Sequence, residues 1–336
     1  MTMLRVGLSG CRGASHELVQ AARTQHDCDV VALHDPDGEA LAALQDATGI
    51  GIGTTDFTAL LATGIDFVVL CGDVRERLVQ VRAATEQAVP CLLASPCAPD
   101  PDTAAAMVAE CERAQTKLGV LVPEFADPLY EQVRCMVADG WLGGIVAVQG
   151  VLGDRARLHG RDCPGTHPFV DLAARQVQLT TWLTGRAIVR VTAQASAQFG
   201  RSDDSAVATA LLRGGAVCTF AASHVTMASA FALHGTDGGI RIAGDRIWLR
   251  GRARFDGQVF AYDTPDRELV LTRADLAPAL RAAAPRFEPL GRFARWLEDT
   301  DDFPCPGEQA TEDLRAVAAM LRALQSGRAE DVTAVQ

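Results

Sequence analysis

The sequence predicts an α/β fold of two domains, with a doubly wound parallel sheet at the N-terminus and an α+β domain with an open, mainly antiparallel sheet at the C-terminus. Three observations predict it. Over the first ~120 residues, short apolar runs alternate with helical patterns, which is typical of a parallel sheet with right-handed crossovers. Beyond about Val146 the strands follow one another closely, and one hairpin signal lies between them. The length of 336 residues is sufficient for both domains.

The N-terminal domain, residues 1–122, is expected to alternate strands and helices in chain order. The first strand leads into a glycine-containing turn and a helix, and the second into an Asp-Pro-Asp-Gly turn and an amphipathic helix. Strands are expected at residues 4–9, 30–34, 67–71, 91–94 and 119–122, with helices that end near Gln25 and Asp46 and that cover 75–88 and 102–117. This alternation predicts a Rossmann-like sheet, in which a ligand binds at the carboxyl ends of the strands.

The C-terminal domain, residues 123–336, is expected to be α+β. Gly214 and Gly215 stand between two apolar runs and predict a tight hairpin. Strands are expected at 188–199, 206–213, 216–224, 231–235, 239–243 and 246–250, after a helix at 169–183 and before helices at 287–300 and 308–326. The Ala/Pro-rich stretch 277–289 is the most loop-like segment.

The composition is that of an ordinary globular chain, with 48% hydrophobic and 22% charged residues. The net charge of −11 gives no electrostatic reason to bind nucleic acid or an anionic membrane. No apolar run approaches the roughly 18 residues of a membrane span, and the N-terminus has no signal-peptide layout, so a cytoplasmic protein is expected. None of the ten cysteines forms a Cys-x-x-Cys pair, which favours buried thiols over disulfides or a zinc site, and no metal is expected.

Several short motifs occur in a characteristic order along the chain. They are Gly13-x-x-His16, Asp35-Pro36-Asp37, Asp139–Gly143, Phe169–Gly185, Gly235–Gly239 and Pro306-Gly-Glu. In this order and spacing, the chain resembles the glucose–fructose oxidoreductase / inositol dehydrogenase / MocA (Gfo/Idh/MocA) family over nearly its whole length. The resemblance implies a domain that holds NAD or NADP, a second domain whose sheet often mediates homo-oligomers, and hydride transfer at a sugar or cyclitol hydroxyl.

The cofactor loop departs from the pattern that the family uses. A dinucleotide loop needs glycines so that backbone N–H groups approach the pyrophosphate at a helix N-terminus. The resemblance places Gly10, Cys11, Arg12 and Gly13 in this loop, but the Gly-x-Gly-x-x-Gly pattern is broken. The loop is either shortened, with Gly13 as its last glycine, or it carries Arg12 and Ser15 in place of the second and third glycines. Arg12 can contact a phosphate by charge; otherwise the loop is only a tight turn.

Two acidic residues bear on the choice of cofactor. Asp35 ends the second strand, where an acid accepts hydrogen bonds from a ribose diol and repels a 2′-phosphate, so the resemblance favours NAD over NADP. The alternative is that Asp35-Pro-Asp-Gly forms a turn or a helix N-cap. Asp73 stands where the family usually has Thr-Pro, and an acid near a pyrophosphate is unfavourable because like charges repel.

The catalytic lysine of the family is missing. Family members usually carry Glu-Lys-Pro after the strand that ends near Leu93, and the lysine helps to move a proton from the reacting hydroxyl. This chain reads Ala-Ser95-Pro96, so Ser95 takes the place of the lysine. The only lysine, Lys117, lies at the end of another helix and is expected to be solvated. Arginine stays protonated at working pH, so no arginine is a plausible general base.

The central helix has also lost residues of the family motif, Asp-x-Gly-x-His-x-x-Asp. The matching positions read Asp171, Arg175 and Gln178, so Arg175 replaces the histidine and Gln178 the second acid. Asp171 and Arg175, four residues apart on a helix, are expected to form an ion pair, which makes Asp171 a poor proton acceptor. The functional alternative is that Arg175 binds an anionic ligand such as a carboxylate or phosphate.

A polar loop before the central helix offers other histidines. Residues 153–167 are rich in arginine and contain His159 and His167. His167 is the candidate for an acid/base in a non-standard position, although a loop histidine is more often only exposed. His224 and His234 lie on predicted strands, where a structural role is expected.

These replacements favour a divergent homologue that has lost standard NAD(P)-dependent sugar or polyol dehydrogenase activity. Such a protein acts as a pseudoenzyme, as a binding protein for a small, anionic or sugar-like ligand, or with altered chemistry. The alternative is a still active NAD-dependent oxidoreductase on a small polar or anionic hydroxy or keto compound, with His167 as its acid/base. Fold alone does not decide between these hypotheses.

Overall fold

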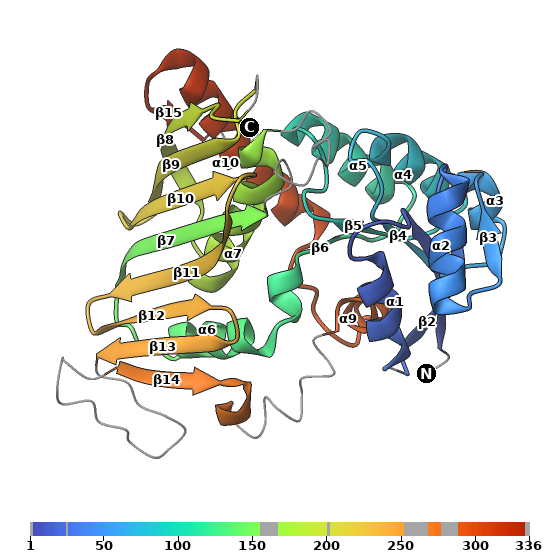
Figure 1. The fold of residues 1–336 in the computed structure, drawn as a ribbon, viewed down its shortest axis with the longest axis horizontal. Helices are drawn as coiled ribbons and strands as arrows, with labels where there is room; N and C mark the ends of the chain where they lie inside the picture. Colours follow the sequence, from blue (N-terminus) through green and yellow to red (C-terminus); the bar gives the residue numbers. More distant parts are fainter. Residues whose placement is uncertain are drawn as a thin grey trace. The chain divides into compact units, whose positions relative to one another are not determined.

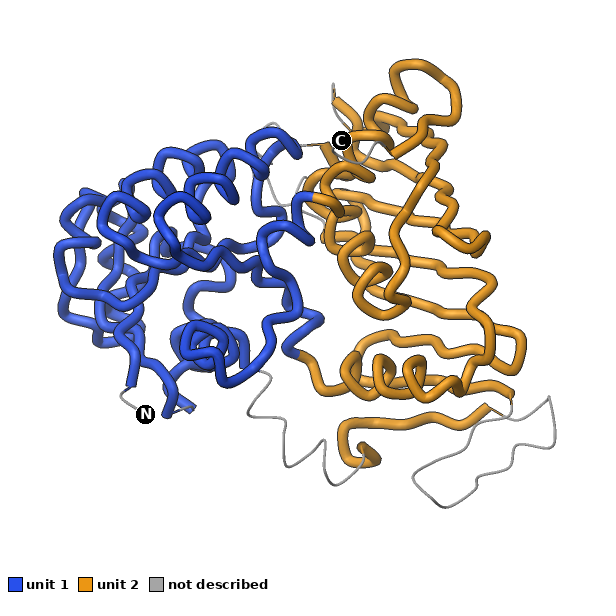
Figure 2. The backbone as a smooth tube through the Cα atoms, turned by 180° about the vertical axis from the view of Figure 1, so that it is seen from behind, with its two compact units in different colours: residues 1–126, 283–311 blue, residues 127–282, 312–336 orange. Residues whose placement is uncertain are grey.

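The computed structural model describes residues 3–24, 26–154, 167–199, 202–251, 268–276 and 288–332. The chain divides into two compact units, shown in different colours in Figure 2. The first contains residues 1–126 and 283–311, and the second contains residues 127–282 and 312–336. The predicted stretch 277–287 and most of the polar loop before the central helix, including His159, lie outside the described residues.

The first unit is built on a six-stranded parallel sheet in the order β3-β2-β1-β4-β5-β6 (Figure 1). Its strands are β1 (Leu4–Ser9), β2 (Cys28–His34), β3 (Ile52–Thr54), β4 (Phe67–Leu70), β5 (Cys91–Ala94) and β6 (Leu118–Leu121). The strand order reverses between β1 and β4, and in doubly wound sheets this reversal marks the crevice in which a ligand binds. The predicted Rossmann-like fold is confirmed.

Four helices of this unit, α2, α3, α5 and α9, begin where the sequence provides a capping side chain. Asp37 caps α2 by accepting hydrogen bonds from the backbone nitrogens of Glu39 and Ala40, and Asp100 caps α5 with a proline at the next position. The helices are α1 (Ser15–Arg23), α2 (Gly38–Thr48), α3 (Phe57–Leu61), α4 (Arg77–Glu86), α5 (Pro101–Arg113), the 3-10 turn η1 (Pro123–Ala126) and α9 (Pro289–Leu297).

The position of α9 differs from the expected division of the chain at residue 122. Residues 283–311 belong to the first unit because Phe293 of α9 lies in its core, 5.1 Å from the ring of Phe67 and 5.3 Å from that of Phe303. Lys117, which was expected to be solvated, donates a 2.5 Å hydrogen bond to the carbonyl of Trp296 and lies over its ring. The C-terminal region therefore contributes to both units.

The second unit contains a nine-stranded sheet in the order β14-β13-β12-β11-β7-β10-β9-β8-β15. Its strands are β7 (Ile145–Asp154), β8 (Ile188–Ser196), β9 (Ser205–Leu212), β10 (Val217–Ser223), β11 (Met227–Gly235), β12 (Gly238–Ala243), β13 (Arg246–Gly251), β14 (Glu268–Thr272) and β15 (Glu330–Asp331). β7 and β10 run parallel and the other paired strands are antiparallel, as expected for a mainly antiparallel sheet.

Helices contact one face of this sheet (Figure 1). They are α6 (Pro128–Ala138) and the central helix, whose π-helical first turn η3 (Phe169–Ala173) continues as α7 (Ala174–Thr184). The last helix, α10 (Gly307–Ser326), contacts α7, because Asp313 accepts a 3.0 Å hydrogen bond from Thr181. The 3-10 turn η4 (Arg273–Asp275) follows β14. Asp127 caps α6 by accepting a hydrogen bond from the backbone nitrogen of Leu129. Within the described ranges, no helix has the length and apolarity required to cross a membrane.

Candidate functional site

The turn after β1 keeps two glycines with positive φ although the expected glycine pattern is broken. Gly10 has a φ of +97°, and a Cβ at this position would lie 2.4 Å from the backbone nitrogen of Gly72. The loop therefore needs glycine here, both for its left-handed backbone and for its close approach to the turn after β4. Gly13 has a φ of +65° and open space around it. No side chain caps α1, so its first-turn N–H groups carry the partial positive charge of a helix N-terminus.

Asp35 connects the loop to the second strand. Its side chain is buried, and its two carboxylate oxygens accept hydrogen bonds from the backbone nitrogens of Cys11, at 2.7 Å, and Asp37, at 2.9 Å. Burial, followed by the charge of Asp35, raises the pKa of the Cys11 thiol to about 12, so Cys11 stays neutral. Asp35 therefore stabilises the loop after β1 through these two hydrogen bonds. The predicted contact of Asp35 with a ribose stays a prediction. The alternative prediction, that this segment caps a helix, is confirmed for Asp37, which caps α2.

Arg12, in the turn after β1, contacts the residue that caps α2. Its guanidinium forms an ion pair with Asp37, and both side chains are exposed. The backbone hydrogen bonds from α2, and then the contact with Arg12, lower the pKa of Asp37. Arg12 thus places a positive charge at the edge of the sheet beside the glycine turn. Because the ion pair is exposed, the guanidinium can leave Asp37 and bind a phosphate.

The acid expected to repel a pyrophosphate, Asp73, is neutralised by a neighbour. Arg75 donates to both of its carboxylate oxygens, from Nε at 3.0 Å and 3.1 Å, and the hydrogen bonds from Arg75 lower the pKa of Asp73. On the adjacent strand, Ser95 follows β5 directly, at the position where the family usually has its lysine. The carboxyl ends of β1, β4 and β5 thus bring Gly10, Asp73 and Ser95 to one edge of the sheet.

The second unit contains a cluster of charged residues that the sequence did not predict. Asp154 ends β7, and His224 follows β10, the strand that runs parallel to β7 with Ser223 opposite Gly153. His224 Nδ1 donates a 3.1 Å hydrogen bond to Asp154 Oδ1. On its other side, His224 Nε2 lies 3.1 Å from Asp171 Oδ2, in the first turn of the central helix, as an ion pair without good hydrogen-bond alignment.

His224 is a buried cation between two carboxylates. Its side chain is 1% exposed. Burial by itself lowers the pKa of His224, but Asp154 and Asp171 outweigh burial and raise the pKa to about 9. This burial is consistent with the expected structural role of His224. The imidazole also forms an ion pair with Asp171, the only acid that remains from the central-helix motif.

His167, the predicted acid/base, lies beside this cluster but both of its ring nitrogens are engaged. Nδ1 accepts a 3.1 Å hydrogen bond from the backbone nitrogen of Phe169, and Nε2 lies 3.2 Å from Asp203 Oδ2. Burial lowers the pKa of His167 despite the nearby carboxylates of Asp203 and Asp171. His167 is therefore neutral near pH 7, with its proton on Nε2, and it must leave Asp203 before it can transfer that proton.

The other two positions of the helix motif do not complete an acid/base pair. Gln178 is buried at 2% exposure, where an amide is tolerated and an ionised carboxylate would need a partner. The predicted ion pair between Asp171 and Arg175 stays a prediction, whereas Asp171 is ion-paired with His224. Sequence reasoning found Asp171 and His167 but missed Asp154 and His224. The sequence feature that could have identified Asp154 and His224 is that each lies at the end of a predicted strand.

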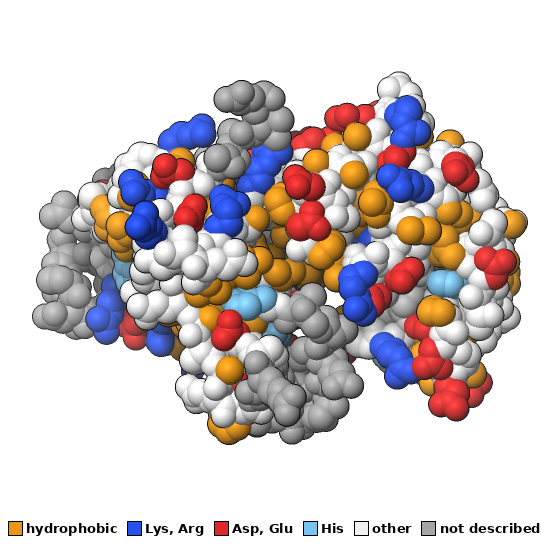
Figure 3. Space-filling view, turned by 90° about the horizontal axis from the view of Figure 1, so that it is seen from above, with side chains coloured by type: hydrophobic (Ala, Val, Ile, Leu, Met, Phe, Trp, Pro, Cys, Tyr) orange, Lys and Arg blue, Asp and Glu red, His pale blue; other side chains and the backbone are white. Residues whose placement is uncertain are grey.

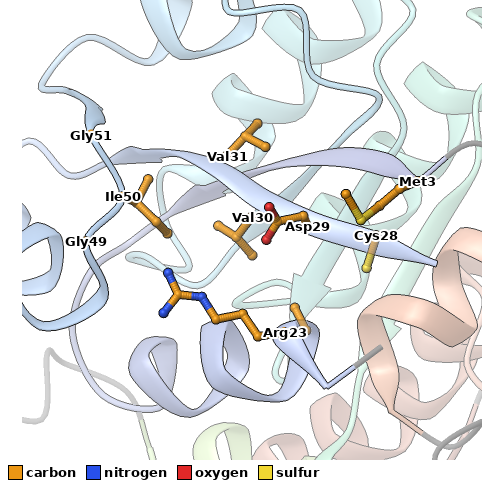
Figure 4. Close-up of a pocket in the computed structure, with 10 residues that line it drawn as sticks. Met3, Arg23, Cys28, Asp29, Val30, Val31, Gly49, Ile50 and Gly51 are labelled. Carbon is orange, nitrogen blue, oxygen red and sulfur yellow. The ribbon is translucent and has the colours of Figure 1, made fainter. Parts of the chain in front are cut away.

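A separate hollow in the first unit lies away from the glycine turn. It has a volume of about 480 Å³ and is lined by Arg23, the first half of β2 and the segment Gly49–Gly51 (Figure 4). Because it adjoins the amino half of β2, it is not part of the crevice at the carboxyl ends of the strands.

Acidic and basic side chains are interspersed on the face shown in Figure 3. In the part of the chain that the structure describes, no group of three or more His, Cys, Asp or Glu side chains is arranged to hold a metal ion.

A doubly wound parallel sheet with a glycine turn after β1, joined to an α+β unit with an open sheet, defines a two-domain protein with the fold of dinucleotide-dependent oxidoreductases. Residues 130–241 match the family model of the GFO/IDH/MocA C-terminal domain. The predicted resemblance to the Gfo/Idh/MocA family is thereby confirmed for these residues of the second unit. A comparison with curated proteins found no match.

Solved structures with the same fold cover essentially the whole chain. An oxidoreductase domain protein from Kribbella flavida has a TM-score of 0.84 at 20% identity, over 99% of this chain and 100% of that one. An oxidoreductase from Agrobacterium radiobacter, in complex with NAD+, L-tartaric acid and magnesium, has a TM-score of 0.82 at 19% identity, over 98% and 99%. The WlbA dehydrogenase from Bordetella pertussis, in complex with NADH and UDP-GlcNAcA, has a TM-score of 0.81 at 21% identity, over 99% of each chain.

Proposed function

We propose that this protein is a divergent Gfo/Idh/MocA homologue that binds NAD in its first unit but has lost the standard sugar or polyol dehydrogenase reaction. One observation carries the proposal: Asp171, the remaining acid of the central-helix motif, is ion-paired with a buried, protonated His224. Ser95 stands at the lysine position, and a serine hydroxyl does not titrate near neutral pH. General acid/base assistance is worth about 10²–10⁴-fold, so these replacements are expected to silence the standard reaction.

The first unit fits a dinucleotide through its backbone. Gly10 makes the required left-handed turn, Gly13 leaves the loop tip open, and the first turn of α1 has no side-chain cap. Arg12 supplies a positive charge, and the carboxylates of Asp35 and Asp37 disfavour a 2′-phosphate, which supports NAD over NADP. When bound, the nicotinamide group supplies hydride-transfer chemistry. The chain itself supplies binding and orientation.

We expect the purified protein to bind NADH without catalysing polyol oxidation. NADH binding, followed by nicotinamide fluorescence, is expected with a Kd below about 100 μM and tighter than that of NADPH. A panel of sugars, polyols and inositols assayed with NAD between pH 7 and pH 10 is expected to give no robust turnover. The double variant Ser95→Lys, Arg175→His tests whether the lost groups are sufficient to restore activity. Robust turnover by the unmodified protein would refute the proposed loss, and no binding of NADH would refute the cofactor assignment.

The alternative, an active oxidoreductase that uses His167, is supported by one observation. His167 is neutral near pH 7 because burial lowers its pKa, and it lies beside Asp171. A small polar or anionic hydroxy or keto compound would then be its substrate, with Arg175 as a candidate anion contact. If turnover is found and His167→Gln abolishes it while NADH binding is unchanged, this alternative replaces the first proposal.

A second copy of this chain is the proposed protein partner, through the sheet of the second unit. The sheet face opposite the helices exposes apolar side chains on three adjacent strands: Val151 on β7, Val217 on β10, and Val207 and Leu211 on β9, each 37–55% exposed. Apolar residues grouped in this way on a flat sheet are typical of an interface between proteins.

We expect the double variant Val207→Lys, Leu211→Lys to dissociate a homo-oligomer. Lysines on the sheet face would have to be desolvated in the interface, which is costly for an unpaired charge. Light scattering after size-exclusion chromatography measures the mass of each form. Val79→Lys is the matched control, because Val79 is 64% exposed on α4 of the first unit. A monomeric unmodified protein, or an unchanged mass of the double variant, would contradict the proposed interface.

A further inference from the structure

One buried arginine of the first unit contacts two of the loops at the carboxyl edge of the sheet. Arg77 is the first residue of α4 and is 4% exposed. Its guanidinium Nη1 donates to the carbonyls of Ala94 and Pro96, which bracket Ser95, and its Nη2 donates to the carbonyl of Gly72 at 3.1 Å. A single side chain thus joins the turn after β4 to the turn after β5.

This placement is costly in three ways. A cation at a helix N-terminus opposes the helix dipole. A buried charge loses its hydration, which three carbonyl contacts offset only in part. In addition, Nε of Arg77 is buried and has no hydrogen-bond partner within the described ranges, and an unsatisfied buried donor is itself destabilising. An arginine at this position in spite of these costs points to a role other than general stability.

The strand order indicates which part of the crevice the two loops serve. In the order β3-β2-β1-β4-β5-β6, the pyrophosphate of a dinucleotide lies at the β1 turn and its adenosine ribose at the end of β2. The turns after β4 and β5 therefore lie toward the nicotinamide half. Gly72 is also the residue that Gly10 approaches, so the guanidinium fixes a backbone segment that adjoins the cofactor loop.

The same contact restores a positive charge next to position 95. The lysine expected there is replaced by Ser95, but Arg77 is hydrogen-bonded to the carbonyls immediately before and after it. The negative charge of Asp73 in the neighbouring turn is paired with Arg75. The net charge of Asp73, Arg75 and Arg77 together is positive, which suits an anionic ligand in the crevice.

We propose that Arg77 is a positioning residue that fixes the turns after β4 and β5 for the nicotinamide half of the cofactor and places there the positive charge that the missing lysine would have supplied. The proposal rests on the proposed NAD binding. It implies that the nicotinamide half responds more strongly to the loss of the guanidinium than the adenosine half, because the β1 turn is also held by the hydrogen bond from Cys11 to Asp35.

The test compares NADH with ADP-ribose, which lacks the nicotinamide ring, in Arg77→Met, Arg77→Gln and Arg77→Lys. The Met and Gln variants are expected to raise the Kd for NADH about tenfold or more, since small misplacements of a binding group have large effects, and the Kd for ADP-ribose by less than about threefold. Arg77→Lys keeps the charge and is expected to recover part of the NADH affinity. Arg82→Met, on the same helix but exposed, is the control and is expected to bind both ligands normally.

Hydrogen exchange of the ligand-free protein provides a readout that does not need the cofactor. Peptides covering residues 70–76 and 94–98 are expected to exchange faster in Arg77→Met, while exchange of residues 9–16 is unchanged. Equal weakening of NADH and ADP-ribose, or unchanged exchange in both turns, would overturn the proposal. If the unmodified protein binds neither ligand, the proposed function fails and the cofactor role of Arg77 fails with it. The exchange data still decide whether Arg77 fixes the two turns.

Discussion

Replacing Arg295 with methionine is expected to lower the free energy of unfolding of the first unit by about 3–5 kcal/mol, the usual cost of removing one partner from a buried ion pair. Arg295 lies on α9, with its side chain only 8% exposed, and contacts Asp27 before β2 and Asp301 after α9. Glu288, which caps α9, is also buried, and burial raises its pKa. Without the guanidinium, these carboxylates would stay in a poorly hydrated space without their cation.

Chemical denaturation of the variants measures this effect. Arg82→Met is the matched control, because Arg82 is 54% exposed and its partner Glu110 is also paired with Arg113, and surface ion pairs contribute about 0–1 kcal/mol. Adding Asp27→Asn to Arg295→Met is expected to recover part of the loss, since it removes one uncompensated charge. A loss below about 1 kcal/mol for Arg295→Met would show that water reaches the carboxylates and that α9 is held by its aromatic contacts alone.

The sequence predicted the order of elements better than their assignment to units. Strands with continuous apolar runs, such as β1 and β5, were recognisable because both faces of a parallel sheet are buried. The three-residue β3 was missed because its side chains are mostly not buried and show no apolar pattern. The place of α9 was not predictable from local pattern, since it depends on Phe293 meeting Phe67 from a distant part of the chain.

The candidate site was predicted in part for a related reason. The glycine turn, Asp35 and Ser95 were found because they follow strands in a recognisable order. Asp154 and His224 were not combined, because only the parallel register of β7 and β10 brings their ends together, and a hairpin signal does not reveal that pairing. Arg77 had no signal, since it lies beside other charged residues at the start of the predicted helix 75–88, where an exposed arginine is expected.

His224 is expected to make the stability of the second unit depend on pH. Its folded pKa, about 9, is above its ordinary value of 6.5, so the stabilising effect is fully present below pH 6.5 and is lost as the pH rises through 9. A shift of this size corresponds to about 3 kcal/mol. The groups that face the imidazole are Asp154 and Asp171, with His167 and Asp203 beyond them, and a neutral His167 adds no cation to the cluster.

The variant His224→Gln isolates this effect, because glutamine is polar but does not titrate. We expect the variant to be less stable than the unmodified protein by about 3 kcal/mol at pH 6.5 and the difference to vanish by about pH 10.5. Denaturant unfolding at several pH values measures the difference, and His234→Gln, on the exposed part of β11, is the control that should show none. A difference that stays constant with pH would mean that glutamine fits the site poorly and that His224 is not charged there. In that case Asp171 would be paired with a neutral ring, and its carboxylate would again be a candidate proton acceptor.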